Sequence, residues 1–384
     1  MCIVTNRAIT VDVVILGGGI AGLWILRSLR IKGYTALLLE SKHLGGGQTM
    51  ASQGVLHGGL KYALNGKLGD ASEAVRDMPA RWKACLEGAG EIDLTRVRVR
   101  SDHQVLWSEG KVASRITSFF ATKALAGRIE KPSALPPALD HPAFKGAVYR
   151  LEEAVIDVPD LVRVLAEPVM DAIAHYTQLT FSGEGVVVDG VQVQAGRIVF
   201  AAGEGNAALM AAAGAPGFPK MQARPLHQVM VAHPELPPFH AVCMGAGTRP
   251  VLVTTTHENA AGSPVWYLGG RLAETGVTRN AADQVLHAQA ELRRLMPWIS
   301  LEGARWRTLE INRAEPATPE GEKPAGAYCR AFERFIVCWP TKLVMAPLLG
   351  EEVLRLMPPP TGARHGLDHD FPRPIMAEPA WGDL

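Results

Sequence analysis

The chain has 384 residues, enough for two or three domains of about 150 residues each and for a large core. Its 39 Lys and Arg residues are balanced by 38 Asp and Glu residues, so it lacks the basic excess that nucleic-acid binding requires. The apolar fraction of 47% excludes a disordered chain and a fibrous repeat.

Five cysteines are scattered without a Cys-x-x-Cys pair, which argues against a disulfide framework or a zinc knuckle. We therefore predict a reduced, cytoplasmic protein and assign no metal ligands. The apolar residues 13–26 contain four glycines and are shorter than the roughly 20 residues of a spanning helix, so no transmembrane segment is predicted. Association with a membrane surface stays open.

The first 40 residues predict one strand–helix–strand unit. Residues 11–16 form a β-branched apolar run, typical of a strand buried on both faces of a parallel sheet. A glycine-rich turn follows. Residues 20–31 have the apolar composition of a buried helix, and Gly33 is predicted to end it. Residues 35–39 predict a second buried strand, which ends at Glu40.

Downstream, helical and extended patterns alternate less regularly. Residues 70–88 carry an apolar stripe at helical spacing, interrupted by Pro79. Residues 92–108 alternate apolar and polar side chains, which predicts a half-solvated antiparallel strand pair, and the proline-rich residues 131–142 predict a loop. Asp157 has the position of a helix N-cap, and the dipeptide at 189–190 predicts a hairpin turn.

The remaining patterns complete an α/β fold class. Strands are predicted over 197–203, 251–256, 264–271 and 335–339, and helices over 281–296 and 345–357. Segments typical of a parallel sheet thus occur at the start, the middle and the end of the chain. We predict a discontinuous Rossmann-type nucleotide-binding domain (1–90, 145–220 and 330–384) and an inserted α+β substrate domain on an antiparallel sheet (91–144 and 221–329).

The turn after the first strand carries Gly17-x-Gly19-x-x-Gly22, the dinucleotide-binding fingerprint between a strand and a helix. Gly17 permits the tight turn, Gly19 lets a pyrophosphate approach the backbone, and Gly22 lets the helix pack closely. The helix start, with Ile20 and Ala21, would direct its positive end at the phosphates. Glu40, followed by Ser41 and Lys42, provides a carboxylate for ribose hydroxyls.

A second glycine-rich segment, residues 45–60, follows the second strand directly. Its flexible backbone and small hydroxyl side chains are spaced to continue along an elongated cofactor. It resembles the FAD-dependent oxidoreductases of the D-amino-acid oxidase superfamily, which includes glycine oxidase, sarcosine oxidase, glycerol-3-phosphate dehydrogenase and 2-hydroxyglutarate oxidase. Residues 55–62 are most similar to the glycerol-phosphate and hydroxyglutarate branch. The resemblance implies FAD as cofactor, with contacts from Gln48, Thr49, Ser52, Gln53, Gly54 and Leu56.

Two later segments extend the resemblance. Residues 198–203, ending in Ala202 and Gly203, are similar to the strand that passes near the flavin. The stretch 339–347 takes the place of the family's closing motif, where the resemblance puts Thr341, Lys342 and Leu343 at the flavin. A helix end and a lysine there would stabilise negative charge on the reduced flavin. The family usually has a glycine-rich turn at this position, from which Trp-Pro-Thr-Lys departs.

The substrate of such enzymes is oxidised at a carbon next to nitrogen or oxygen and is usually held through a carboxylate. Residues 311–321 resemble the family's Arg-Pro-x-Thr stretch, so Arg313 is the candidate carboxylate anchor; the alternative is a surface arginine paired with Glu310 or Glu315. Arg271 and Tyr267, on a strand that the resemblance places at the border of the pocket, are further candidates, with an ion pair and core packing as their alternatives.

Two histidines bear on the reaction type, because alcohol oxidation needs a base whereas a neutral amine can be oxidised without one. His57 is a candidate for a catalytic or flavin contact, or for a hydrogen bond that orders its loop. His227 is a candidate to enter the pocket from the inserted domain.

The combined prediction is an FAD-dependent enzyme. It removes a hydride from a small, carboxylate-bearing amine or amino acid; the alternative substrate is a 2-hydroxy acid or a glycerol phosphate. A flavin-binding protein without turnover is the hypothesis from a different class. The electron acceptor is O2, a quinone or another protein.

Overall fold

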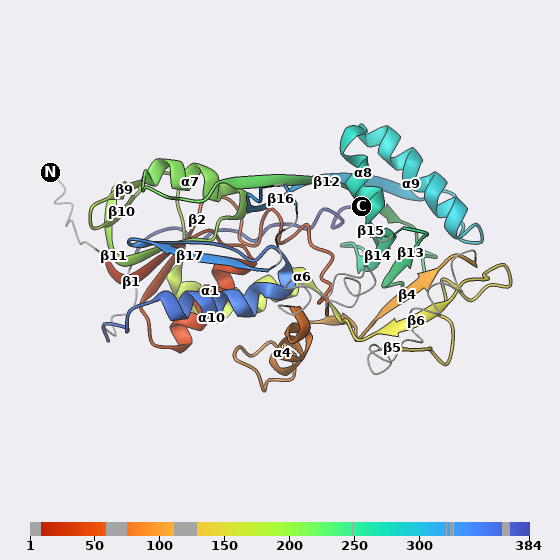
Figure 1. Ribbon diagram of the computed structural model, residues 1–384, viewed down its shortest axis with the longest axis horizontal. Helices are drawn as coiled ribbons and strands as arrows, with labels where there is room; N and C mark the ends of the chain where they lie inside the picture. Colours follow the sequence, from red (N-terminus) through yellow and green to blue (C-terminus); the bar gives the residue numbers. More distant parts are fainter. Residues whose placement is uncertain are drawn as a thin grey trace.

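The computed structural model describes residues 9–58, 75–110, 129–362 (apart from 248, 320, 323 and 325) and 369–384. The molecule is elongated, with one sheet at each end (Figure 1). The first sheet has eight strands: β1 (Ile9–Leu16), β2 (Ala36–Glu40), β8 (Ile173–His175), β9 (Leu179–Ser182), β10 (Gly185–Val188), β11 (Val191–Phe200), β17 (Tyr328–Phe332) and β18 (Phe335–Trp339).

In this sheet β18, β11, β1, β2 and β8 run parallel in that spatial order. The predicted strands at the beginning, middle and end of the chain therefore do meet in one sheet. β10 and β11 form the predicted hairpin, and Asp189 and Gly190 turn it with φ of 47° and 86°, as a two-residue turn with two positive φ angles requires.

The second sheet also has eight strands: β4 (Gln104–Ser108), β5 (Ile129–Glu130), β6 (Val148–Leu151), β12 (Met221–Ala232), β13 (Ala241–Met244), β14 (Pro250–Glu258), β15 (Pro264–Gly269) and β16 (Arg305–Pro316). It is antiparallel except where β4 pairs with β13 in parallel. The predicted division into domains stays a prediction, but β6 pairs in this second sheet, although the division assigns its residues to the nucleotide-binding domain.

The prediction of one antiparallel strand pair over 92–108 is wrong. β3 (Val99–Ser101) pairs with β7 (Val155–Ile156) in a separate two-stranded sheet, whereas β4 pairs with β6 and β13. β4 is also buried along its whole length rather than half-solvated. Alternating polarity indicated extended backbone correctly at 99–101 and 104–108, but residues 92–98 form turns and bends, and the pairing partners of both strands come from distant parts of the chain.

The helices cover the sheets and close the ends of the strands: α1 (Ile20–Ile31), α4 (Met78–Leu86), α6 (Val158–Ala166), η2 (Glu167–Ala172), η3 (Gly203–Gly205), α7 (Asn206–Ala213), α8 (Arg271–Thr275), η4 (Gly276–Thr278), α9 (Ala281–Leu295), η5 (Leu343–Met345) and α10 (Ala346–Leu356). Pro79 stands in the first turn of α4, which begins at Met78, and residues 70–74 lie outside the described residues. Asp157 caps α6 by accepting a hydrogen bond from the Asp160 amide.

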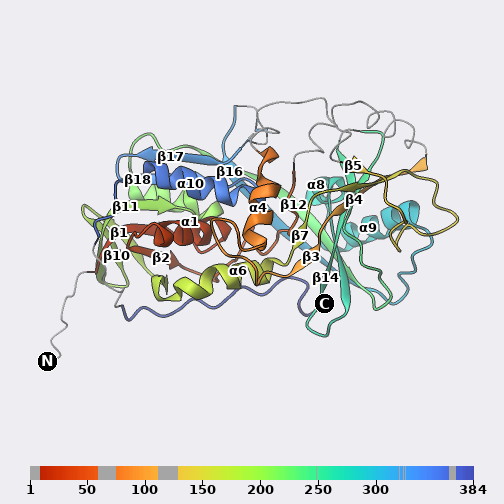
Figure 2. The ribbon, with the colours of Figure 1, turned by 90° about the horizontal axis from the view of Figure 1, so that it is seen from below.

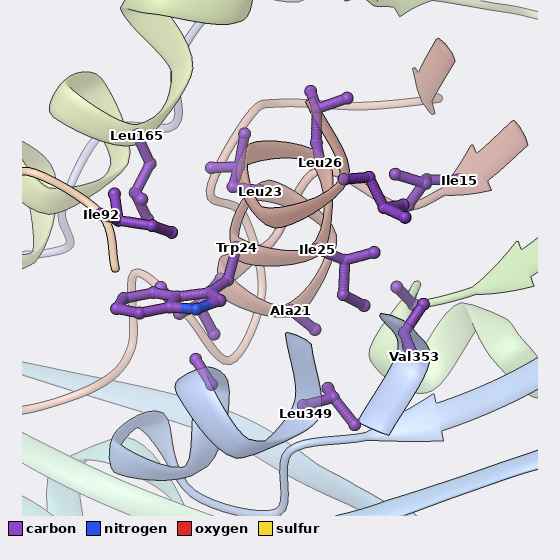
Figure 3. Close-up of a cluster of buried hydrophobic side chains, with 14 of the residues drawn as sticks. Ile15, Ala21, Leu23, Trp24, Ile25, Leu26, Ile92, Leu165, Leu349 and Val353 are labelled. Atoms are coloured by element: carbon purple, nitrogen blue, oxygen red, sulfur yellow. The ribbon is translucent and has the colours of Figure 1, made fainter. Parts of the chain in front are cut away.

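The main core packs α1 against the first sheet, α6 and α10. Figure 3 shows α1 between Ile15 of β1, Leu165 of α6, and Leu349 and Val353 of α10. Trp24 of α1 is fully buried; burying a large apolar side chain contributes roughly 1.5–3 kcal/mol. A second cluster covers the other face of β1, so this strand is buried on both faces as predicted.

Two long strands link the halves of the molecule. β12 and β16 pair over twelve residues, from Met221 opposite Pro316 to Ala232 opposite Arg305. They extend from the region of the first sheet to α8 and α9 over the second sheet (Figures 1 and 2). The side chains of β12 and β16 are therefore positioned by one continuous stretch of hydrogen-bonded backbone.

Candidate functional site

A cavity of about 640 Å³ opens where the carboxyl ends of β1, β2, β11 and β18 meet. Ligands of parallel α/β sheets bind at this edge. The first sheet and the loops after its strands form one wall, and β12 and β16 add residues of the second sheet. The lining is drawn from residues 17–21, 39–57, 201–209, 311–314 and 339–344, with Tyr176, Leu226 and Gln228.

The glycine turn after β1 has the geometry that the fingerprint requires. Gly17 has a φ of 110°, and a Cβ there would lie 2.5 Å from Ala202 Cα. A Cβ on Gly22 would lie 1.9 Å from the Gly17 carbonyl oxygen, so α1 packs against the turn only because residue 22 is glycine. Gly22 acts through this packing and does not line the cavity, whereas Gly19, Ile20 and Ala21 do.

The first turn of α1 faces the cavity without an acidic side chain. The Ile20 amide donates to Thr49 Oγ1 at 3.0 Å, which ties the loop after β2 to the helix start. The positive helix end suits the linked phosphates of a dinucleotide.

Glu40 lies at the end of β2, with both carboxylate oxygens held by backbone amides. Oε2 accepts from Gly18 at 2.6 Å and Oε1 from Lys42 at 2.7 Å. Each carboxylate oxygen can accept more than one hydrogen bond, so ribose hydroxyls can still bind here. Glu40, Ser41 and Lys42 all line the cavity.

The loop after β2 connects the cavity to the second sheet. Gln48 Oε1 accepts from the Ala314 amide of β16 at 2.9 Å, and Gln53 Nε2 donates to the Tyr267 carbonyl of β15 at 2.7 Å. Gln48, Thr49, Ser52 and Gln53 line the cavity as expected of cofactor contacts.

Two predicted cofactor contacts in this loop lie outside the lining. Leu56 is buried in the main core, and Gly54, with a φ of 73°, packs so closely that a Cβ would lie 2.1 Å from the Ile156 carbonyl oxygen. Both positions support the shape of the loop. Residues 59–62 of the stretch that resembles the glycerol-phosphate branch lie outside the described residues.

The segment after β18 replaces the expected glycine turn with a strained one. Thr341 has a φ of 58°, unusual for a β-branched residue, and its hydroxyl donates to the Gly326 carbonyl at 3.0 Å. Trp339 Nε1 donates to the Gly203 carbonyl at 2.9 Å, which joins this segment to the end of β11. Ala202, Gly203, Thr341, Lys342 and Leu343 all line the cavity.

Arg313 lies on β16 and lines the cavity. Its Nε donates to the Arg224 carbonyl at 3.3 Å, and Nη1 lies 3.9 Å from Glu274 Oε1. Glu315, the alternative partner considered for Arg313, is fully buried and binds both Nε and Nη2 of Arg224, at 2.7 and 2.6 Å. The structure thus places Arg313 at the cavity wall.

Two of the other predicted substrate residues lie outside the lining. Arg271 begins helix α8 instead of ending a strand, and its side chain is exposed, because Gly270 with a φ of 77° ends the extended backbone. Tyr267 is fully buried on β15, and its hydroxyl lies 2.6 Å from Gln228 Oε1 and 2.9 Å from the Ala51 carbonyl oxygen. Burial raises the pKa of Tyr267 far above its ordinary value. Tyr267 therefore supports cavity residues rather than forming the wall.

The two candidate histidines differ in whether they line the cavity. His57 lines the cavity, with Nδ1 3.0 Å from Oε2 of the buried Glu153. His227 is buried away from the lining, with Nδ1 3.1 Å from the Gly276 carbonyl oxygen.

Sequence reasoning missed several lining residues, among them Glu204, Leu226, Gln228 and Asn312. Leu226 and Gln228 alternate along β12, a two-residue period that places them on one face of the strand. Glu204 accepts from Asn312 Nδ2 at 2.9 Å, a contact between residues 108 positions apart that no local pattern reveals.

Within the residues described, no three His, Cys, Asp or Glu side chains are grouped so that they could hold a metal ion. Among the same residues, no helix is both long enough and apolar enough to span a membrane.

The cavity fits FAD. Its lining runs from the acidic end of β2, past the glycine turn and the start of α1, to the segment after β18. A carboxylate that can accept ribose hydroxyls, a helix start that can bind phosphates and a backbone-rich wall thus follow one another in the order that an extended dinucleotide needs. When bound, FAD accepts a hydride from the carbon that is oxidised.

Comparison with known proteins gives the family. The sequence matches the family described as DAO, FAD dependent oxidoreductase, over residues 12–316. A probable FAD-dependent oxidoreductase of Pseudomonas aeruginosa is 47% identical over 386 residues, covering 98% of each chain. The crystal structure of the FAD-dependent oxidoreductase from P. aeruginosa has a TM-score of 0.85 at 43% identity, again covering 98% of each chain.

More distant solved structures share the fold. Glycine oxidase from Geobacillus kaustophilus has a TM-score of 0.67 at 18% identity, covering 91% of this chain and 95% of that one. L-α-glycerophosphate oxidase from Mycoplasma pneumoniae, with FAD bound, has a TM-score of 0.64 at 16% identity, covering 97% of each chain. The family match and the close relative show that this chain is an enzyme of the DAO family of FAD-dependent oxidoreductases.

Proposed function

We propose that this enzyme oxidises a small amine or amino acid at the carbon next to nitrogen, and that Arg313 holds the carboxylate of the substrate. The observation that carries the proposal is the place of Arg313 on β16, in the cavity wall that faces the loops of the first sheet. A guanidinium binds a carboxylate through two parallel hydrogen bonds, which fixes the orientation of the substrate as well as its position.

The other side chains that we assign to substrate binding are polar but not strongly basic. Gln228 and Asn312 contribute amides, Glu204 contributes a carboxylate, and Lys342 contributes an ammonium group. A phosphate dianion is usually bound by several cations and backbone amides together. This mixture of charges suits a zwitterionic amino acid better than a glycerol phosphate.

One observation favours the alternative, a 2-hydroxy acid. His57 lines the cavity next to the buried carboxylate of Glu153, and such a pair can take the hydroxyl proton that alcohol oxidation releases. The resemblance of residues 55–62 to the glycerol-phosphate and hydroxyglutarate branch agrees with this alternative.

Anaerobic reduction of the bound flavin separates the two substrates. The FAD-loaded enzyme is mixed without oxygen with glycine, N-methylglycine, both enantiomers of proline, lactate, 2-hydroxyglutarate and glycerol 3-phosphate, and loss of flavin absorbance is followed. We expect bleaching by amino acids or N-methylated amino acids. Bleaching by hydroxy acids alone would establish the alternative, and a flavin that no donor bleaches would support a binding protein without turnover.

The electron acceptor, O2, a quinone or another protein, belongs to the same proposal. Reoxidation of the bleached enzyme by air with release of hydrogen peroxide indicates an oxidase. Reoxidation only by a quinone or by a redox protein indicates a dehydrogenase. The cytoplasmic location stays a prediction.

A further inference from the structure

A buried asparagine, Asn206, lies directly behind the cavity wall. It begins α7, follows the lining residues 201–205, and is fully buried although its side chain is polar. Burying an amide is costly unless its oxygen and its nitrogen are both hydrogen-bonded. The partners that satisfy Asn206 therefore indicate what its side chain holds in place.

The hydrogen bonds of Asn206 join the ends of two parallel strands. Its Oδ1 accepts from the Ala202 amide at 2.8 Å, and its Nδ2 donates to the Cys338 carbonyl at 3.1 Å. Nδ2 also donates, over a longer 3.4 Å, to the Phe200 carbonyl, which the Cys338 thiol meets at 3.2 Å. Phe200 ends β11, and Cys338 is the last residue but one of β18. One side chain thus connects the carboxyl ends of both strands at the edge where the cavity opens.

Asn206 acts where the backbone pairing of these strands stops. The register of β11 with β18 ends at Phe200 opposite Val337, and beyond this pair both chains turn into the cavity wall. Asn206 connects the two chains after that point. Trp339 connects them again, because its Nε1 donates to the Gly203 carbonyl at 2.9 Å. The two side chains therefore continue the contact between the strands into the wall.

The bonds of Asn206 shape residues 202–205, here called the β11 turn. The Ala202 amide is bonded to Asn206 Oδ1, and the Ala202 carbonyl accepts from the Gly205 amide at 3.0 Å, so both peptide groups of Ala202 are fixed. Ala202 packs against the glycine fingerprint: a Cβ on Gly17 would lie 2.5 Å from Ala202 Cα. A displaced β11 turn would therefore change the width of the cavity beside Gly17.

We propose that Asn206 is a positioning residue for FAD, which holds the β11 turn against the end of β18 and so forms one wall of the cofactor site in advance. Residues 202–205 line the cavity and Asn206 does not, so Asn206 acts through the turn. A site that must first be ordered binds its ligand more weakly than a site that is already formed. The inference concerns only the cofactor and is independent of the proposed substrate.

Asn206→Leu is the sharpest test, with Gln284→Met as the matched control. Leucine has nearly the shape of asparagine but makes none of its hydrogen bonds. Gln284 of α9 is also fully buried and lies outside the lining. Its Oε1 accepts from Arg279, and its Nε2 donates to the His227 and Leu272 carbonyls. Both variants thus leave buried polar groups unpaired, but only Asn206→Leu does so behind the cofactor wall.

The measurement is the dissociation constant of FAD, obtained by stepwise dilution of each loaded enzyme and read from the fluorescence of the released flavin. Circular dichroism gives the unfolding temperatures, and the dilutions are made well below them. We expect both variants to unfold at lower temperatures than the wild type. The dissociation constant should rise about tenfold or more in Asn206→Leu and less than about threefold in Gln284→Met, because only the first displaces the β11 turn.

Equal dissociation constants in the two variants overturn the proposal, because Asn206 then stabilises the fold without positioning the cofactor. The readout needs no substrate, so it stands apart from the test of the proposed function. If Asn206→Leu does not fold, Asn206→Ser replaces it, since serine is well suited to the start of a helix. We expect Asn206→Ser to bind FAD more weakly than Gln284→Met, and equal binding again overturns the proposal.

Discussion

Arg313 differs from the other arginines of its strand in its surroundings. Arg305 at the far end of β16 is exposed, and Arg307 donates to the Ala380 carbonyl at 2.8 Å and pairs with Asp383. Of these three, only Arg313 lines the cavity. Arg313 is therefore the candidate substrate anchor, and Arg305 and Arg307 of the same strand are matched controls.

The first prediction concerns this anchor. Arg313→Ala should raise the substrate dissociation constant about tenfold or more, because losing a charge-assisted hydrogen bond costs roughly 1.5–3 kcal/mol. FAD content should stay unchanged. The dissociation constant is read from the substrate dependence of anaerobic bleaching, with Arg305→Ala as the control. Equal affinity in the two variants would exclude Arg313 from the substrate site.

The backbone of Thr341 is strained, and comparing two substitutions at this position can measure the free-energy cost of the strain. Its φ of 58° lies in the left-handed region, which costs a residue with a Cβ about 1–2 kcal/mol. Thr341→Ala and Thr341→Gly both lose the hydroxyl bond to Gly326, but only glycine removes the strain. We predict that Thr341→Gly unfolds at a higher temperature than Thr341→Ala. Calorimetry of the two variants in parallel measures both unfolding temperatures. A higher unfolding temperature for Thr341→Ala than for Thr341→Gly would mean that the turn is unstrained.

At the scale of elements, a half-buried histidine lies at the edge of the β13–β14 pair. His240, just before β13, accepts a long hydrogen bond of 3.4 Å from the Thr256 amide of β14. Burial, with Arg100 and His103 nearby, lowers the pKa of His240 from 6.5 to about 4. Between these values the unfolded chain binds a proton that the folded protein does not, so folding loses stability as the pH falls through this window.

We therefore predict that His240→Gln weakens the acid sensitivity of folding. The decrease in unfolding temperature from pH 7 to pH 4.5 should be smaller in this variant than in the wild type, measured by differential scanning fluorimetry in buffers of equal ionic strength. The exposed His141 gives the control variant His141→Gln. A decrease identical in all three proteins would assign the acid sensitivity to other groups, such as the buried His257, whose pKa is also lowered by burial.

At the scale of the whole molecule, residues 371–384, here called the C-terminal strap, connect the two sheets. Near the first sheet the amides of His175 and Leu44 donate to the Pro372 and Ile375 carbonyls at 2.7 and 2.8 Å. Near the second sheet the Ala260 amide donates to the Gly382 carbonyl at 2.7 Å. The strap runs along the edge of the molecule from one sheet to the other (Figure 2).

The strap ends in a buried aromatic contact behind the cavity. Trp381 is 1% exposed, and its ring centroid lies 4.1 Å from that of His257 and 5.4 Å from that of Tyr267. Tyr267 in turn contacts Ala51 and Gln228 of the lining. The strap thus supports the cavity wall through one intervening residue.

We predict that Trp381→Ala destabilises the fold by about 3–5 kcal/mol, the usual cost of removing a buried tryptophan side chain, and releases FAD at a lower temperature. Flavin fluorescence on heating reports the release, and circular dichroism reports unfolding. Ile375→Ala, in the same strap but 69% exposed, should change neither by much. A Trp381→Ala enzyme that retains FAD up to the wild-type temperature would show that the strap does not support the cavity.

Much of the first sheet could be predicted because its signals are local. The apolar run of β1, the glycine turn and the buried helix after it each follow from side chains within a few positions of one another. The caps and turns at Asp157 and Asp189 are local in the same sense. The place of Gly17, Gly19 and Glu40 at the cavity could be predicted for the same reason, since they belong to the same unit.

Contacts between distant strands could not be predicted. The strands over 92–108 were assigned to each other although they belong to different sheets. Arg271 left the predicted strand because a positive φ at Gly270 redirected the chain.

The sequence alone determined the cofactor class, because dinucleotide recognition here is mainly a property of one short, continuous strand–turn–helix–strand segment. Only the tertiary structure decided which side chains line the cavity. Arg313 and His57 come from separate segments, and their common place in the lining depends on the pairing of β12 with β16 and of residues 54–58 with 153–156. Such long-range pairing is fixed by the packing of the whole chain, and no local periodicity encodes it.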